Sequence, residues 1–112
     1  MNIKHFTSIK TTKEFNRIYK NSKRVHTQQF VLFYRYKSDE YRFGVVASKK
    51  VGKAVHRNRS KRLLRSHFIN YIDKLKPGYY IFVAKAPILE AEYTKVDRAI
   101  FKALKRLKAF KQ

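Results

Sequence analysis

The sequence has no cysteine and no tryptophan, and only three glycines and two prolines among its 112 residues. The absence of cysteine excludes disulfides and thiolate metal sites, and it is compatible with a reducing compartment. With so little Gly and Pro, no flexible linker, internal repeat or low-complexity segment is evident. We therefore expect a single domain over residues 1–112, with residues 1–10 forming a flexible N-terminal segment.

Acidic residues and long apolar runs are also scarce. Only 7 Asp and Glu stand against 28 Lys and Arg, which gives a formal net charge of +21. Such an excess repels itself unless an anionic partner relieves it, and nucleic acid is the commonest such partner. The longest purely apolar runs, 30–34 and 79–84, are far too short to span a bilayer. Because residues 1–5 lack the apolar core of a signal peptide, we expect a cytoplasmic protein with no membrane partner.

The few acids and histidines argue against a nuclease centre within the protein. A metal-dependent nuclease needs several carboxylates that converge on its ions, whereas the acids here are scattered along the chain. If His56 and His67 share one helix, they stand about 16 Å apart, too far to act on one phosphate. Residues 51–54 lack the upstream glycine and the following Ser or Thr of a phosphate-binding loop. We expect no catalytic residue and no metal site in this chain.

The apolar fraction of 44% and the aromatic fraction of 15% are sufficient for a packed core. Residues 11–21 are predicted to form a short helix, because Thr11 and Glu14 have capping-box spacing and an i, i+3, i+4 apolar stripe begins at Phe15. A second helical stripe, over residues 92–110, predicts a C-terminal helix.

Between these helices, alternating β-branched and aromatic residues predict strands. Residues 24–37 and 41–47, joined by a polar turn, are expected to pair as a hairpin, with a short extra strand near Val25. A long helix at 54–75 and a buried strand at 79–85 follow. The order is therefore αβββαβα, an α/β (α+β) sandwich with a small mixed central sheet and packed helices.

A dense basic segment opens the long helix. At 100° per residue, five polar residues share one arc, which we call the basic arc: Arg57, Asn58, Lys61, Arg62 and Arg65. Lys49, Lys50 and Lys53 precede the helix, whose N-terminal amides also favour phosphate. Because no acid occurs between Lys49 and Ile72, intrahelical ion pairs on a solvated face do not account for these charges. The arc predicts RNA binding, since arginine donates bidentate bonds to phosphate.

Other functions fit the sequence less well. A basic zipper requires a leucine every seven residues, and Leu64 is followed at that spacing by Tyr71 and Gly78. A membrane-active cationic protein requires an exposed amphipathic helix, and the stripe at 92–110 is explained more simply by packing on a sheet. A general RNA chaperone or ribosomal-type RNA-binding protein remains the alternative, although it does not explain the ordered arc.

The basic segment closely resembles the Arg-Asn-Arg signature of the bacterial ribonuclease P protein subunit. The resembling residues are Lys49-Lys50-Val51-Gly52-Lys53-Ala54-Val55-x-Arg57-Asn58-Arg59-x-Lys61-Arg62-x-x-Arg65. The likeness extends in the same order from about residue 10 to residue 110. It includes Phe15-x-x-x-Tyr19, Gln29-Phe30-Val31-Leu32-Phe33, Arg42-Phe43-Gly44-Val45, the strand at 79–85 and the basic C-terminal helix.

This resemblance implies the protein component of ribonuclease P, in which a catalytic RNA subunit removes the 5′ leader of precursor tRNA. The protein would bind that RNA and the leader, and would broaden the substrate range. No further protein partner is implied, and Mg²⁺ would act in the holoenzyme through the RNA. The residues implied to face the RNA are Lys49, Lys50, Lys53, Arg57, Asn58, Arg59, Lys61, Arg62 and Arg65.

The resemblance also implies a cleft for the single-stranded leader. Its residues, which we call the leader residues, are Phe15, Tyr19, Val31 and Phe33. By pattern alone, Phe15 and Tyr19 at helical spacing are more typical of core packing than of base stacking. Both faces of the strand at 30–34 are apolar, however, so one face is open to a further role. The family further implies a left-handed strand–helix–strand crossover, whereas the general rule would predict a right-handed one.

Overall fold

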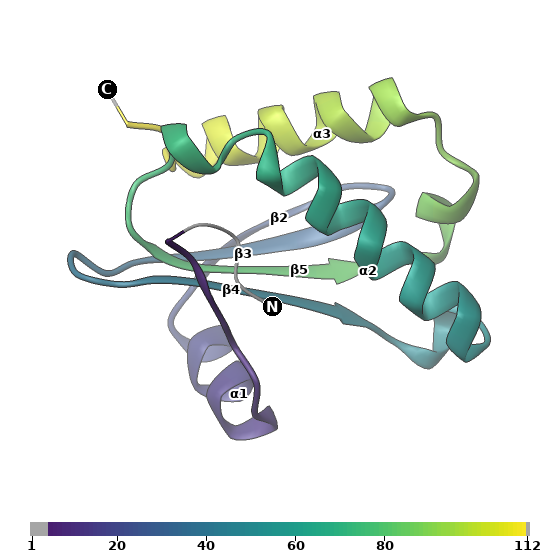
Figure 1. The fold of residues 1–112 in the computed structure, drawn as a ribbon, viewed down its shortest axis with the longest axis horizontal. Helices are drawn as coiled ribbons and strands as arrows, with labels where there is room; N and C mark the ends of the chain where they lie inside the picture. Colours follow the sequence, from purple (N-terminus) through teal and green to yellow (C-terminus); the bar gives the residue numbers. More distant parts are fainter. Residues whose placement is uncertain (1–4, 112) are drawn as a thin grey trace.

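A computed structural model describes residues 5–111 and contains one mixed sheet and three α-helices (Figure 1). In chain order the elements are β1 (Thr7–Ser8), α1 (Thr12–Lys20), β2 (Lys23–His26), β3 (Phe30–Tyr36), β4 (Tyr41–Ala47), α2 (Ala54–Ile69), β5 (Gly78–Ala84) and α3 (Tyr93–Arg106). The five strands lie in the order β1-β4-β5-β3-β2. The mixed α+β architecture and the strand near Val25 are confirmed.

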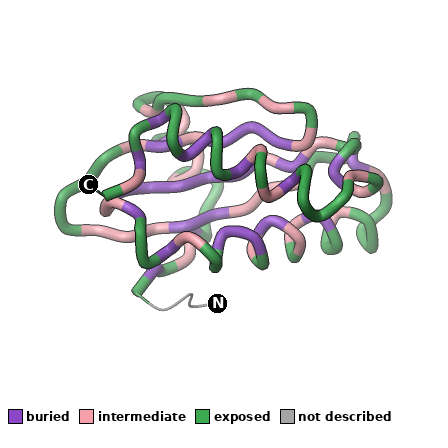
Figure 2. The backbone as a smooth tube through the Cα atoms, turned by 90° about the horizontal axis from the view of Figure 1, so that it is seen from above, coloured by how far each residue is buried: buried purple, intermediate pink, exposed green. Residues whose placement is uncertain are grey.

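The two faces of the sheet are covered differently. Helices α2 and α3 pack on one face, where the larger apolar core includes Phe30, Leu32 and Tyr80. Helix α1 packs on the other face over a smaller cluster that includes Ile18 and Ile81. Figure 2 shows that the buried stretches concentrate in the central strands, whereas the helices alternate between buried and exposed turns. In the described part of the chain, no helix is long and apolar enough to cross a membrane.

The predicted hairpin between residues 24–37 and 41–47 is wrong, because β5 lies between β3 and β4. β5 is antiparallel to β3 and parallel to β4, and Gly78 at its start faces both Tyr36 and Tyr41. The Gly78 amide donates to the carbonyl of Glu40, 2.6 Å away, inside the turn that was expected to close the hairpin. β5 takes this position because its side chains are apolar on both faces and nearly all buried.

The connection from β4 through α2 to β5 joins two adjacent parallel strands. When the strands point upward and α2 lies in front of the sheet, β5 stands to the left of β4 (Figure 1). The crossover is therefore left-handed, as the family resemblance implies and contrary to the general rule.

Two chain segments differ from the sequence expectations. The expected flexible segment 1–10 is wrong for its described part: Phe6 and Ile9 are buried, and β1 pairs with β4. Residues 1–4 lie outside the described residues. The helix expected at 54–75 ends at Ile69, which is 44% exposed and not part of the core. A separate 3-10 turn, Ile72–Lys74, lets the chain bury Leu75 against the C-terminal segment.

Candidate nucleic-acid interface

Helix α2 is fixed on the sheet by one buried stripe. Leu64 and Phe68 are fully buried, and the Phe68 ring stacks on Phe43 with centroids 4.4 Å apart. Ser60 and His67 complete the stripe. Ser60 is small, and its hydroxyl donates to the carbonyl of Arg57, 2.8 Å away, so the stripe buries little unpaired polarity. This packing fixes which side of α2 meets solvent.

The exposed side of α2 brings most of the basic arc together. Asn58, Lys61, Arg62 and Arg65 line one shallow surface depression, with Val55 as its apolar member. Such a group offers guanidinium, ammonium and amide donors within one patch, which suits the phosphates and sugar edges of a folded RNA.

Two predicted RNA-binding residues of α2 lie apart from that depression. Arg57 is partly buried, and its guanidinium donates to the carbonyl of Gly52, 3.3 Å away. Arg57 lies beside the buried stripe of α2. The turn before α2 folds back against this side of the helix, which brings the Gly52 carbonyl within reach of the Arg57 guanidinium. Arg59 is exposed but does not line the depression. Arg57 thus braces the entry to the helix.

The three lysines before α2 are exposed around its N-terminus. A 3-10 turn, Lys49–Val51, anchors this approach through Val51, which is 5% exposed. Lys53 is the N-cap residue but makes no side-chain capping bond, and the first turn holds no acid. Uncapped N-terminal amides carry partial positive charge, so this end of the helix favours an anion.

The leader residues come together on the opposite face of the sheet. The Tyr19 ring lies 4.7 Å from that of Phe33, tilted by 56°, and 6.2 Å from that of Phe15. All three rings are partly exposed, whereas Val31 is 8% exposed. Burial raises the pKa of Tyr19 above its ordinary value, so its ring stays neutral.

Three residues next to the leader residues were not predicted from the sequence. Val83 and Val46 extend the Val31 row across β5 and β4, and both are partly exposed. The Phe15 ring packs directly on the backbone of Gly44. A Cβ atom at position 44 would lie 2.6 Å from Cε1 of Phe15. Because β5 is apolar on both faces, its sequence gives no signal that singles out Val83, and Gly44 required the packing of α1 to be known.

The junction of α2 and α3 holds a polar cluster centred on Asp97. Its carboxylate accepts from the Tyr71 hydroxyl at 2.7 Å and lies 3.2 Å from His67 Nδ1. Burial, with the bond to Asp97, raises the pKa of Tyr71 to about 12. His67 is 1% exposed and stacks on Tyr93, so it serves the helix junction. Within residues 5–111, no group of three or more His, Asp or Glu is placed to hold a metal ion.

The fold and the exposed basic helix define an α+β nucleic-acid-binding protein. The chain matches the Ribonuclease P family over residues 3–108. It is 47% identical to the ribonuclease P protein component of Nitratiruptor sp. over 106 residues, covering 95% of this chain and 96% of that protein. It is 34% identical to the component of Clostridioides difficile over 109 residues, covering 95% and 96%.

Solved structures agree with these relatives. The fold superposes on the Staphylococcus aureus RNase P protein with a TM-score of 0.81 and 31% identity, covering 93% of this chain and 97% of that one. For the Thermotoga maritima RNase P protein the TM-score is 0.76 at 25% identity, with 88% and 96% covered. The chain belongs to the ribonuclease P protein family, the protein components of a tRNA-processing endonuclease.

Proposed function

We propose that the protein binds the catalytic RNA subunit of ribonuclease P through α2 and the preceding lysines. The observation that carries this proposal is the basic depression of Asn58, Lys61, Arg62 and Arg65 on a helix without acids. Because the buried stripe holds α2 rigidly, the donors are fixed before binding, and assembly costs less conformational entropy.

In the same proposal, the leader residues bind the 5′ leader of precursor tRNA. Stacking on an aromatic ring tolerates sequence variation, because every base has a π-face, and this suits leaders of differing sequence. The protein contributes no catalytic group: the RNA subunit cleaves the leader with Mg²⁺ held through RNA, in the cytoplasm. By adding leader contacts the protein broadens the range of precursors, and it needs no further protein partner.

The decisive experiment neutralises the depression. Replacing Lys61, Arg62 and Arg65 with Gln is expected to weaken binding of the cognate RNA subunit and to flatten its salt dependence. Removing one phosphate-binding cation reduces the log–log slope by about 0.7–0.9. Binding is measured by filter retention or fluorescence over a series of salt concentrations.

A matched control removes the same charge from α3, where Arg98, Lys102 and Lys105 are exposed. Replacing these three residues with Gln should leave most of the affinity for the RNA subunit, and most of the log–log salt slope, unchanged. Assembly that is unchanged in the α2 variant, or equally weakened in both variants, would show that the depression is not the RNA-binding site.

A further inference from the structure

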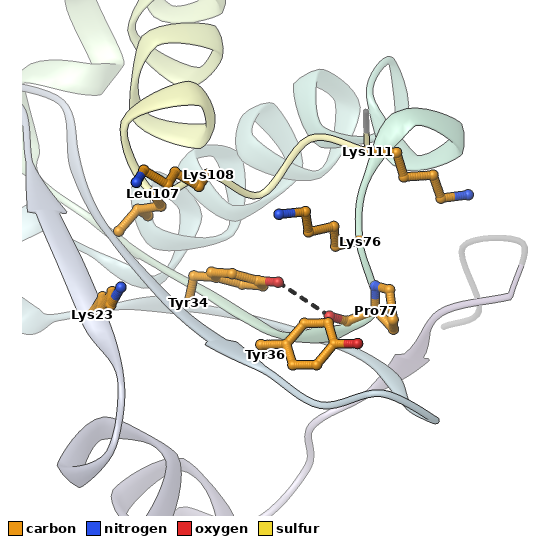
Figure 3. A pocket seen from close by; sticks show the side chains of 8 residues that line it. All are labelled: Lys23, Tyr34, Tyr36, Lys76, Pro77, Leu107, Lys108 and Lys111. Atoms are coloured by element: carbon orange, nitrogen blue, oxygen red, sulfur yellow. Dashed lines mark hydrogen bonds between the residues drawn. The ribbon is translucent and has the colours of Figure 1, made fainter.

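A second basic surface lies beyond the C-terminal end of α3, which we call the lysine pocket. Its eight lining residues include four lysines and two tyrosines, and none is acidic: Lys23, Tyr34, Tyr36, Lys76, Pro77, Leu107, Lys108 and Lys111. Figure 3 shows Lys23, Lys76 and Lys108 on the side of Tyr34, whereas the Lys111 side chain lies farther out and points away from both rings. Within residues 5–111 the lining offers four ammonium groups and no carboxylate, which favours an anionic ligand.

The backbone that carries three of these lysines is tied together. The Lys76 amide donates to the carbonyl of Ala109 at 2.7 Å, and the Lys111 amide to that of Lys74 at 2.8 Å. Between them Leu75 and Phe110 form an antiparallel bridge. The lysines therefore extend from a fixed frame.

The two tyrosines differ in what they offer a ligand. Tyr34 is 5% exposed; its hydroxyl donates to the carbonyl of Pro77 at 3.2 Å, and its ring packs on Tyr80. Tyr36 is 58% exposed, so much of its ring is open to a ligand. Tyr34 thus forms a fixed wall of the pocket, and Tyr36 offers an exposed aromatic ring on which a ligand can stack.

Lys108 adds an independent observation. Its φ of +58° is the one positive value for a non-glycine residue within the described chain. It follows Leu107, the C-cap of α3, at the position where helices prefer glycine because a side chain is strained there. The backbone adopts this strained conformation while carrying an ammonium group to the pocket.

We propose that the lysine pocket binds a single-stranded segment of RNA, with a base stacked on Tyr36 and the flanking phosphates held by the lysines. The pocket is separate from the proposed contacts. Its Lys76–Pro77 side lies at the opposite end of the 36 Å long axis from the start of α2 (Figure 1). Tyr34 belongs to the core on the α2 and α3 face, whereas the leader residues lie on the other face. The choice of RNA over other polyanions rests on the proposed function.

The test uses the full chain carrying Phe33→Ala, which weakens the leader site, and a labelled oligouridylate of about ten nucleotides. Adding Tyr36→Ala is expected to weaken binding about 5- to 150-fold, the range for one stacked base. Adding Lys76→Gln with Lys111→Gln should lower the log–log salt slope by about 0.7 for each phosphate that is no longer neutralised. The matched control, Lys102→Gln with Lys105→Gln, removes the same charge from exposed positions outside the pocket and should change the slope less.

Lys108→Gly separates binding from folding, because its two effects have opposite signs. Glycine removes the strain, so the thermal midpoint is expected to rise, while loss of the ammonium weakens oligouridylate binding. Unchanged binding in both Lys108→Gly and Tyr36→Ala would overturn the proposal. If Lys108→Gly and Tyr36→Ala bind oligouridylate normally while the α2 variant fails to assemble with the RNA subunit, only the lysine pocket is refuted. If the two pocket variants lose binding while the α2 variant assembles normally, the α2 assignment is refuted and the lysine pocket is supported.

Discussion

Tyr19 and Phe33, whose rings are in contact, contribute both to the packing of the smaller core and to the proposed binding surface. Both residues pack at the edge of the smaller cluster, yet both rings keep exposed area beside the Val31 row. A ring that is held from behind and open in front loses little entropy when a base stacks on it. This arrangement favours leader binding over plain core packing.

Phe33→Ala is therefore expected to weaken binding of precursor tRNA by the holoenzyme by about 1–3 kcal/mol, the value of one stacked base. Binding of mature tRNA, which lacks the leader, should stay unchanged. Dissociation constants for the two ligands, measured side by side, check the expectation. Equal losses for both ligands would remove the leader assignment.

Tyr71 gives the α2–α3 junction a pH dependence. Its folded pKa, about 12, lies above the ordinary 10.0, so its contribution to stability is complete below pH 10 and is lost as the pH rises towards 12. Tyr71→Phe removes the bond to Asp97 and is expected to cost about 1–2 kcal/mol at about pH 8. The difference in the free energy of unfolding between wild type and variant should become smaller by about pH 11–12. Urea unfolding at several pH values measures this difference. A constant gap would mean that Tyr71 does not titrate in this way.

At the scale of elements, α1 is held on the sheet by two contacts of different kinds. Glu14 forms an ion pair of 2.8 Å with Arg42 of β4, and the Phe15 ring lies over Gly44 of the same strand. Close approach to a strand backbone is possible only where no Cβ intervenes. The position of α1, and of the leader residues it carries, therefore depends on a glycine.

Gly44→Ala should displace the Phe15 ring, lower stability by about 1–3 kcal/mol and weaken leader binding. Combining it with Phe15→Leu, which removes the ring, should recover part of the missing stability, and the double-mutant cycle measures the coupling. Chemical denaturation of the four proteins provides the data. Additive losses would mean that the two residues do not share this contact.

At the scale of the whole molecule, a charge of +21 is distributed over separate surfaces with different geometries. A general RNA chaperone would use that charge without fixed sites. A ribonucleoprotein subunit instead adds ordered contacts that lower the requirement for free cations, because protein ammonium and guanidinium groups replace counterions at the phosphates.

Adding the protein to its cognate RNA is accordingly expected to lower the divalent-metal concentration needed for leader cleavage. The measurement is the cleavage rate over a magnesium titration, with and without protein. Protein incubated with precursor tRNA and metal, but without the RNA subunit, should not cleave. An unchanged metal requirement would favour the chaperone alternative, and specific 5′ cleavage by the protein alone would contradict the non-catalytic role.

Local signals in the sequence determined the start of α1 and the buried stripe of α3. Thr11 caps α1 by accepting from the Glu14 amide at 3.1 Å, and the predicted stripe of α3 is buried at Val96, Ile100 and Leu104. The acid-free basic segment likewise specified an exposed cationic helix. These features depend on residues within a few positions of one another, so periodicity and capping rules suffice to predict them.

Only the tertiary structure decided the pairing of β5 between β3 and β4, the burial of Phe6, and the separation of Arg57 from the other arc residues. Strands pair through backbone amides and carbonyls, which are the same in every residue type. A strand that is distant in the sequence, such as β5, can therefore insert between two strands that are neighbours in the sequence. The side of α2 that meets solvent was likewise fixed by which residues the sheet could bury. The sequence determined which residues could form the sites, and long-range packing decided where on the molecule they lie.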